Sequence, residues 1–193
     1  MAELSGVRIG CAMTGSFCTF KEAFSQWRRL SDAGAELIPI MSFNACSVDN
    51  RFFSAKDAVE IFEEICGNKV LNRIEQVEPI GPKKLLDILI VSPCTGNTIA
   101  KIANGITDTP AALAVKSHLR NARPVLIAVS TNDALSGSAQ NIGKLLNTKN
   151  IYFVPFRQDD PGKKPASCVA SFDLLPASTK AALEGRQIQP ILV

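Results

Sequence analysis

DILIVSPCTGNT, residues 87–98, joins a short apolar run to a cluster of small polar residues. The apolar part, Asp87–Val91, predicts a buried β-strand. A continuous apolar run fits a strand that is covered on both faces, and such strands belong to parallel sheets flanked by helices. The polar part leads into a helix predicted at Asn97–Asn104, so a strand, a polar loop and a helix follow one another.

The same order recurs along the chain. Further strands are predicted at Val7–Met13, Glu36–Met41, Pro124–Ser130 and Ile151–Val154, the last strand of the sheet. Further helices are predicted at Thr19–Ala33, Ala111–Asn121, Ala139–Asn147 and Ser167–Glu184. Another helix is predicted to begin directly after Ser54, which can cap it. Gly34 is placed to end the first helix, and Pro39 indicates an edge strand. Residues 43–53 and 155–165 are predicted to be polar loops, and Glu75–Ile80 a short extra strand.

This alternation of strands and helices predicts the fold class. It indicates an α/β fold with a doubly wound, mostly parallel sheet sandwiched by helices, as in Rossmann-like proteins. No linker, repeat or low-complexity segment interrupts residues 1–193, so we expect a single domain. In such sheets the loops at the carboxyl ends of the strands line the ligand crevice.

The composition narrows the class of function. The 21 basic and 18 acidic residues give a net charge of +3, which is too mild to indicate nucleic acid or an anionic membrane as a partner. No apolar run approaches the roughly 20 residues of a membrane span, and Met1–Val7 lacks the pattern of a signal peptide. Six cysteines without a CxxC pair, and a single histidine, argue against a metal site and for free thiols. We therefore expect a cytoplasmic protein.

Three polar clusters follow three of the predicted strands. They are Thr14-Gly15-Ser16, Thr95-Gly96-Asn97-Thr98 within Ser92–Thr98, and Ser130-Thr131-Asn132-Asp133. Because the carboxyl ends of parallel strands meet at one edge, we expect the clusters to lie together. Hydroxyl groups and the free N–H groups of helix N-termini suit a phosphate or a polar ring, so the clusters predict a ligand site.

Each cluster also has a plainer explanation. Gly15 and Ser16 can form an ordinary turn, Thr95 or Asn97 can cap a helix, and Asn132 favours turns. The GxGxxG pattern of dinucleotide sites is missing.

Two other features are weaker candidates. His118 precedes a strand, so it is predicted at the opposite edge of the sheet, in a surface or helix-end position. Asp159 and Asp160 are predicted at the ligand edge, in a solvated loop with Lys163 and Lys164.

Residues 7–155 resemble the flavoprotein family, which includes flavin-dependent cysteine decarboxylases and flavin prenyltransferases. The resemblance rests on Thr14-Gly15-Ser16, Ser42, Pro93–Thr98, Asn132 and Gln140-Asn141-Ile142. It implies a bound flavin mononucleotide (FMN) and an assembly of three copies or a multiple. The implied cofactor-binding residues are Gly15, Ser16 and Ser42 for the phosphate, Thr95, Gly96, Asn97, Thr98, Ser130, Thr131 and Asn132 for the ring or ribityl chain, and Thr14.

The chain departs from that family at three points. The decarboxylases have an active-site histidine after their second strand, and residues 43–53 contain none. Their Met-Asn pair with a following Met is replaced by Thr131-Asn132 without that Met. Residues beyond Phe156 also differ from the prenyltransferases. Neither cysteine decarboxylation nor prenyl transfer is supported, and no catalytic side chain is assigned.

A narrower resemblance lies in Pro93–Thr109, Ser130–Leu135 and Leu146–Phe156. These segments resemble one component of a two-component oxidoreductase of sporulating bacteria, within the same family. This implies a partner subunit that resembles a nicotinamide-dependent dehydrogenase and through which NADP is bound. It also implies a small dicarboxylate substrate and a location in the cytoplasm of the mother cell. Arg157, Lys163 and Lys164 are candidates for the substrate carboxylates. Two alternatives are a flavin-free component that binds nicotinamide or substrate, and a non-catalytic component that stabilises its partner.

Overall fold

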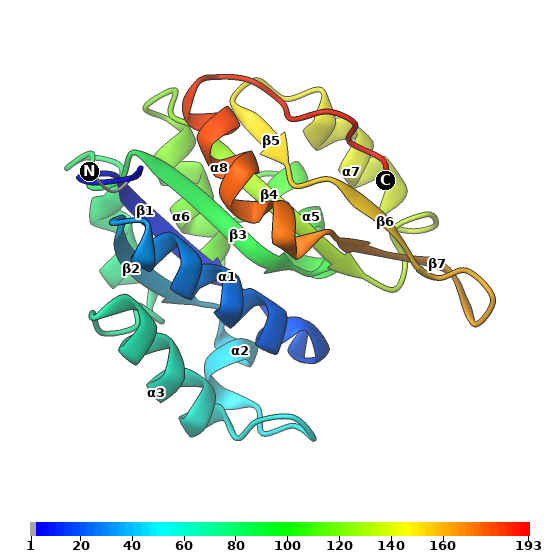
Figure 1. Ribbon diagram of the computed structural model, residues 1–193, viewed down its shortest axis with the longest axis horizontal. Helices are drawn as coiled ribbons and strands as arrows, with labels where there is room; N and C mark the ends of the chain where they lie inside the picture. Colours follow the sequence, from blue (N-terminus) through cyan, green and yellow to red (C-terminus); the bar gives the residue numbers. More distant parts are fainter. Residues whose placement is uncertain (1–2) are drawn as a thin grey trace.

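The computed structural model describes residues 3–193, so Met1 and Ala2, which begin the segment predicted to lack a signal peptide, lie outside it. The strands form one sheet in the order β2-β1-β3-β4-β7-β6, with β5 also paired to β4 (Figure 1). The parallel strands are β1 (Arg8–Met13), β2 (Glu36–Met41), β3 (Ile88–Cys94), β4 (Val125–Thr131) and β5 (Ile151–Phe153). The predicted α/β fold with a mostly parallel sheet is confirmed.

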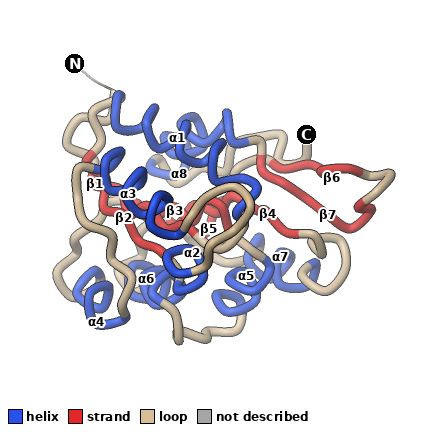
Figure 2. Tube along the Cα trace, turned by 90° about the horizontal axis from the view of Figure 1, so that it is seen from below, coloured by secondary structure: helices blue, strands red, loops and turns tan. Residues whose placement is uncertain are grey.

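Helices cover both faces of the sheet (Figure 2). One face carries α1 (Phe20–Asp32), α3 (Ala55–Cys66) and α8 (Leu175–Leu183), and the other carries α4 (Ile74–Val77), α5 (Gly96–Ala103), α6 (Pro110–Leu119) and α7 (Ala139–Leu146). In β3, Ile88 and Ile90 enter the first core, whereas Leu89 and Val91 enter the second. Successive side chains of a strand point to opposite faces, so two cores explain the continuous apolar run.

Local signals behave as predicted at several element ends. Gly34 follows α1 with a φ of 90°, a left-handed conformation that glycine adopts without strain. The Ser54 hydroxyl accepts the N–H of Asp57 at 3.0 Å and caps α3. Pro39 lies in β2, the edge strand. None of the helices within residues 3–193 is both long and apolar enough to cross a membrane.

Two predictions in the first half of the chain are wrong. Residues 43–53 begin with a helical turn, α2 (Phe43–Ser47), because the Ser42 hydroxyl accepts the N–H of Ala45 and caps it. Glu75–Ile80 is not a strand but α4 followed by the 3₁₀ turn η2 (Glu78–Ile80). The side chain of Gln76 accepts the N–H groups of Asn72 and Arg73, which favours a helical start there.

Three predictions for the end of the chain are also wrong. Ile151–Val154 is not the last strand, because two strands follow it. Residues 155–165 are not a loop, because β6 (Phe156–Asp160) and β7 (Lys164–Ala170) form an antiparallel hairpin. The last helix, predicted to begin at Ser167, begins at Leu175, after the 3₁₀ turn η3 (Phe172–Leu174). Its predicted first residues, Ser167–Ala170, belong to β7. The hairpin pairs with the end of β4 through Ser130–Val169 and Thr131–Cys168, and its tip projects beyond the helices (Figure 1).

Candidate functional site

A cleft of about 1030 Å³ opens where the chain leaves β1, β3 and β4. The first turn of α1 forms one side of the cleft, and the β6–β7 hairpin contributes another. Of the predicted site residues, Gly15, Ser16, Thr95, Ser130 and Asn132 line it. Thr131 lines it as well. The sheet therefore brings parts of all three polar clusters to one place, at the edge where α/β proteins bind ligands.

Three hydroxyl groups meet at the floor of the cleft. Ser16 Oγ lies 2.7 Å from Ser130 Oγ, although the two residues are 114 positions apart. Thr19 Oγ1 lies 3.2 Å from Ser16 Oγ and 3.3 Å from Ser130 Oγ. We call Ser16, Thr19 and Ser130 the hydroxyl trio. It joins the start of the first helix to the carboxyl end of β4.

The helix start beside the hydroxyl trio has no side-chain cap. The 3₁₀ turn η1 (Phe17–Thr19) runs directly into α1, and neither Ser16 nor Thr19 caps it with its side chain. The first N–H groups of a helix have no intrahelical acceptor, and the helix dipole favours an anion there. This end of the cleft therefore has the donors and the field that suit a phosphate.

Gly15 lines the cleft beside these donors and has no side chain to occupy it. A β-carbon at this position would lie 3.6 Å from Cβ of Asn44 and 3.7 Å from Cζ of Phe17, which are ordinary contacts. The protein itself does not require glycine at residue 15. A side chain there would occupy the cleft instead.

The remaining predicted site residues lie outside the cleft surface. Thr14 is buried, and its hydroxyl donates to the carbonyl of Pro93 at 2.8 Å and accepts the N–H of Thr95 at 2.9 Å. Ser42 is buried as the cap of α2. Thr98 is buried and accepts the Thr95 hydroxyl at 3.3 Å, while Asn97 is exposed outside the cleft. Thr14, Thr98 and Ser42 thus hold the loops in place.

Gly96 is enclosed by the third polar cluster. A β-carbon on Gly96 would lie 2.6 Å from the hydroxyl oxygens of Thr131 and Ser138 and 2.7 Å from Oδ1 of Asp133. That carboxylate oxygen accepts both hydroxyls, at 2.5 Å and 2.9 Å. The Asp133 carboxylate lies beside Gly96, the first residue of α5, and a negative charge at this end of a helix interacts favourably with the helix dipole. This part of the cluster therefore fixes the start of α5.

Sequence reasoning missed several residues that line the cleft. Arg51 and Phe52 come from the segment after α2, and the Arg51 guanidinium carbon lies 4.7 Å from the centre of the Phe52 ring. They follow no periodic or motif pattern, so no sequence signal identifies them. The exposed thiol of Cys18 also lines the cleft.

The candidates on the hairpin divide into two groups. Arg157, Asp159 and Lys164 line the cleft, whereas Lys163 and Asp160 do not. Lys164 Nζ lies 3.0 Å from Oδ2 of Asp159, so these two charges pair with each other.

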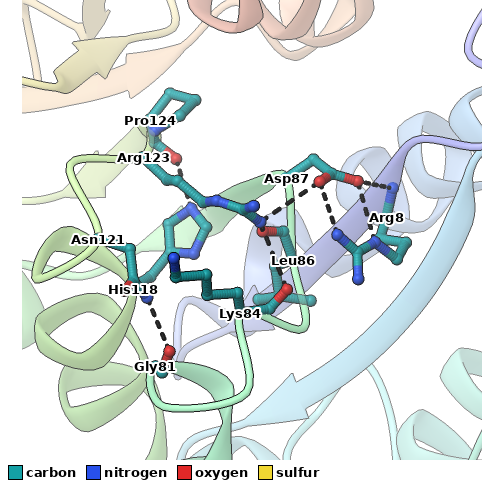
Figure 3. A network of polar contacts seen from close by, with 9 residues as sticks. All are labelled: Arg8, Gly81, Lys84, Leu86, Asp87, His118, Asn121, Arg123 and Pro124. Atoms are coloured by element: carbon teal, nitrogen blue, oxygen red, sulfur yellow. Dashed lines mark hydrogen bonds and ion pairs between the residues drawn. The ribbon is translucent and has the colours of Figure 1, made fainter.

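His118 lies at the opposite end of the sheet and in the last turn of α6, so the helix-end alternative is confirmed and the surface alternative is wrong. It is 1% exposed near the end of α6, and its Nε2 lies 3.1 Å from the carbonyl oxygen of Pro124 (Figure 3). Burial lowers the pKa of His118 to about 4. Within residues 3–193, no group of three or more histidine, cysteine, aspartate or glutamate side chains is arranged to hold a metal ion.

Comparison with known proteins identifies relatives across nearly the whole chain. The Flavoprotein family model matches residues 1–183. The B subunit of dipicolinate synthase from Bacillus subtilis (strain 168) is 46% identical over 193 residues, which are 100% of this chain and 96% of that protein.

Two solved structures extend the comparison. The B subunit of dipicolinate synthase from Bacillus halodurans C has a TM-score of 0.91 at 39% identity and covers 99% of this chain and 98% of its own. DmrB of Burkholderia xenovorans, solved in complex with FMN, has a TM-score of 0.67 at 19% identity over 92% of this chain and 96% of its own, and this likeness shows the fold alone. From the family match and the full-length identity, the chain belongs to the flavoprotein family, in the branch that contains the B subunit of dipicolinate synthase.

Proposed function

We propose that this chain acts as the B subunit of a dipicolinate synthase, holding FMN in the cleft. Together with a dehydrogenase-like A subunit, it contributes to the oxidation of a dihydrodipicolinate-pathway intermediate to dipicolinic acid. The observation that carries the proposal is the cleft, which combines the uncapped helix start, the hydroxyl trio and the absence of a side chain at Gly15. The similarity of the chain to the B subunit of dipicolinate synthase from Bacillus subtilis supports the choice of this enzyme.

The residues of the cleft suit the chemical parts of FMN. Ser16, Thr19 and the N–H groups of the first helical turn suit the phosphate. Thr95, Ser130 and Asn132 offer polar groups for the ribityl chain or the polar edge of the ring. Phe17, Phe52 and Phe172 line the same cleft and offer aromatic surface to a flat ring.

The proposed chemistry follows from the overall reaction. Converting a dihydropyridine dicarboxylate to a pyridine dicarboxylate removes two electrons and two protons from the ring. Bound FMN would supply the two-electron acceptor at this site. The side chains that line the cleft would position the substrate.

The proposal includes the assembly and the setting. The chain would form a homo-oligomer of three copies or a multiple, with residues 1–193 as a single domain. It would bind the A subunit, which carries NADP, in the cytoplasm of the mother cell of a sporulating bacterium. The substrate would be a small dicarboxylate, with neither nucleic acid nor membrane as a partner.

The first test is an absorbance spectrum of the purified chain after FMN is added and free flavin is removed. We expect a retained flavin band near ~450 nm at one flavin per chain. Gly15→Val should lose this band because its side chain fills the space beside the phosphate donors, while the circular dichroism spectrum stays unchanged. Gly143→Ala is the matched control, since no atom lies within 4 Å of a β-carbon there.

The same preparations distinguish the alternatives. If neither the chain alone nor its complex with the A subunit retains flavin, FMN binding is wrong. Nicotinamide or substrate binding by the chain would then favour the flavin-free alternative. If the chain binds none of these and only raises the thermal stability of the A subunit, it is a non-catalytic partner.

A further inference from the structure

The basic side chains of the cleft are not equivalent. Lys164 pairs with Asp159, so its charge is neutralised locally. Lys21 lies in the first turn of α1, next to the proposed phosphate site. Arg51 and Arg157 form no ion pair with any carboxylate in residues 3–193, although Glu22, Asp159 and Asp173 also line the cleft. Two guanidinium groups are thus left unpaired in a cleft that also contains carboxylates.

The two arginines come from opposite sides of the molecule. Arg51 belongs to the segment between α2 and α3, which follows the edge strand β2. Arg157 belongs to β6, the strand at the other end of the sheet order. Both line the cleft that contains Ser16 and Ser130. The lining of the cleft therefore includes one guanidinium group from each of these two segments.

Each arginine is already held by a neutral neighbour. Arg157 Nη1 donates to the Ser171 hydroxyl at 3.2 Å, and Arg51 lies over the ring of Phe52 at 4.7 Å. A guanidinium group has five N–H donors, so one bond to Ser171 leaves most of the Arg157 fork free. Side chains that are held before binding lose less conformational freedom when a ligand arrives.

We infer that Arg51 and Arg157 each bind one carboxylate of a small dicarboxylate, and that the presence of two unpaired guanidinium groups selects this class of substrate. The guanidinium fork matches a carboxylate with two parallel hydrogen bonds and stays charged at any physiological pH. The inference rests on the proposed function for the identity of the ligand. It adds the residues that set substrate specificity.

The test compares two ligands that differ by one carboxylate. Pyridine-2,6-dicarboxylate and pyridine-2-carboxylate are titrated into the FMN-loaded chain by calorimetry. We expect the dicarboxylate to bind the wild type at least about tenfold more tightly, since a charge-assisted pair is lost with the single carboxylate. Arg51→Gln and Arg157→Gln should each weaken dicarboxylate binding about tenfold and reduce the ratio of the two affinities toward one.

Arg28→Gln is the matched control, because it makes the same charge change on the exposed surface of α1, outside the cleft. Its affinity ratio should equal that of the wild type. If both cleft variants keep the wild-type ratio, or if the wild type binds the two ligands equally or not at all, the inference is wrong.

The flavin absorbance of the same samples separates this result from the proposed function. Retained flavin with an unchanged ratio refutes only the role of the arginines. A wild type without retained flavin refutes the FMN proposal, and titration of that flavin-free chain still measures the ratio.

Discussion

Arg8 and Asp87 tie the start of β1 to the residue before β3 through three hydrogen bonds. The backbone N–H and Nε of Arg8 donate to Oδ2 of Asp87 at 2.9 Å and 3.1 Å, and Nη2 donates to Oδ1 at 2.8 Å. Arg123 Nη1 lies 3.3 Å from the same Oδ1 (Figure 3). The Arg8 hydrogen bonds hold the pKa of Asp87 below its ordinary value. This network lies at the amino ends of the strands, opposite the cleft.

Replacing Asp87 with Asn should therefore destabilise the fold without affecting the cleft. Asn keeps the size of the side chain but loses the charge that pairs with Arg8. We expect the free energy of unfolding to fall by about 1–2 kcal/mol, and partial exposure of the pair keeps this loss small. Urea unfolding at pH 7 measures this loss. Glu60→Gln, which breaks the exposed 3.7 Å pair with Lys56, should cost less than about 0.5 kcal/mol. Equal losses in the two variants would contradict the structural role of Asp87.

His118 should make stability depend on pH between about 4 and 6.5. Its folded pKa of about 4 lies below the ordinary value of 6.5, so the unfolded chain binds the proton first as the pH falls. Stability is fully present above pH 6.5, and it declines until the folded form also protonates near pH 4. This predicts a loss of about 2 kcal/mol between pH 7 and pH 5.

The measurement is urea unfolding at both pH values, for the wild type and for His118→Gln. Because His118 is the single histidine of the chain, the variant should show almost no difference between the two pH values, whatever its absolute stability. An equal pH dependence in the two proteins would show that other groups cause it.

Two glycine-to-alanine changes should have opposite effects. Gly96→Ala places a β-carbon within 2.6–2.7 Å of three polar atoms, and we expect a loss of about 1–3 kcal/mol because the surrounding cluster must shift. Gly143→Ala meets no atom within 4 Å inside α7, so higher helix propensity should raise stability by about 0.5–1 kcal/mol. Thermal unfolding of both variants checks the prediction. A neutral Gly96→Ala would mean that the Asp133 cluster packs loosely.

Cys18 should be the thiol that reacts first with a disulfide reagent. It is exposed in the cleft, whereas Cys11, Cys66, Cys94 and Cys168 are buried and Cys46 is half-buried. Burial raises the pKa of the Cys46 and Cys94 thiols, which further slows their reaction. We expect one fast thiol per chain, absent in Cys18→Ser and slowed by FMN. A fast phase that persists in Cys18→Ser would place the reactive thiol elsewhere.

The sequence predicts the central sheet well because its signals there are local. Apolar runs such as Asp87–Val91 predict strands, and Ser54 and Gly34 mark helix ends. The β6–β7 hairpin is missed because Asp159, Asp160 and their lysine neighbours are typical of a loop. Its strand conformation depends on pairing with Ser130 and Thr131 of β4, which a local pattern does not contain.

The candidate site is predicted in part. A run of small polar residues after a strand predicts the correct edge of the sheet, and Ser16 and Ser130 do meet there. The run does not reveal which side chains face the cleft and which face a neighbouring loop. Thr14, Thr98 and Gly96 are enclosed by neighbouring residues, and the sequence does not predict this. Arg51 depends on the course of an irregular segment, for which the sequence has no signal.

The hydroxyl trio also determines how many hydrogens remain for a ligand. Three hydroxyl groups carry three hydrogens. One is used between Ser16 and Ser130, and Thr19 directs its own to the carbonyl oxygen of Ser16 at 2.9 Å. One hydrogen of the Ser16–Ser130 pair is left over, and it can point either to Thr19 Oγ1, which lies 3.3 Å from Ser130 Oγ, or into the cleft. The floor of the cleft can therefore present a donor or an acceptor by rotating two C–O bonds, without moving the backbone.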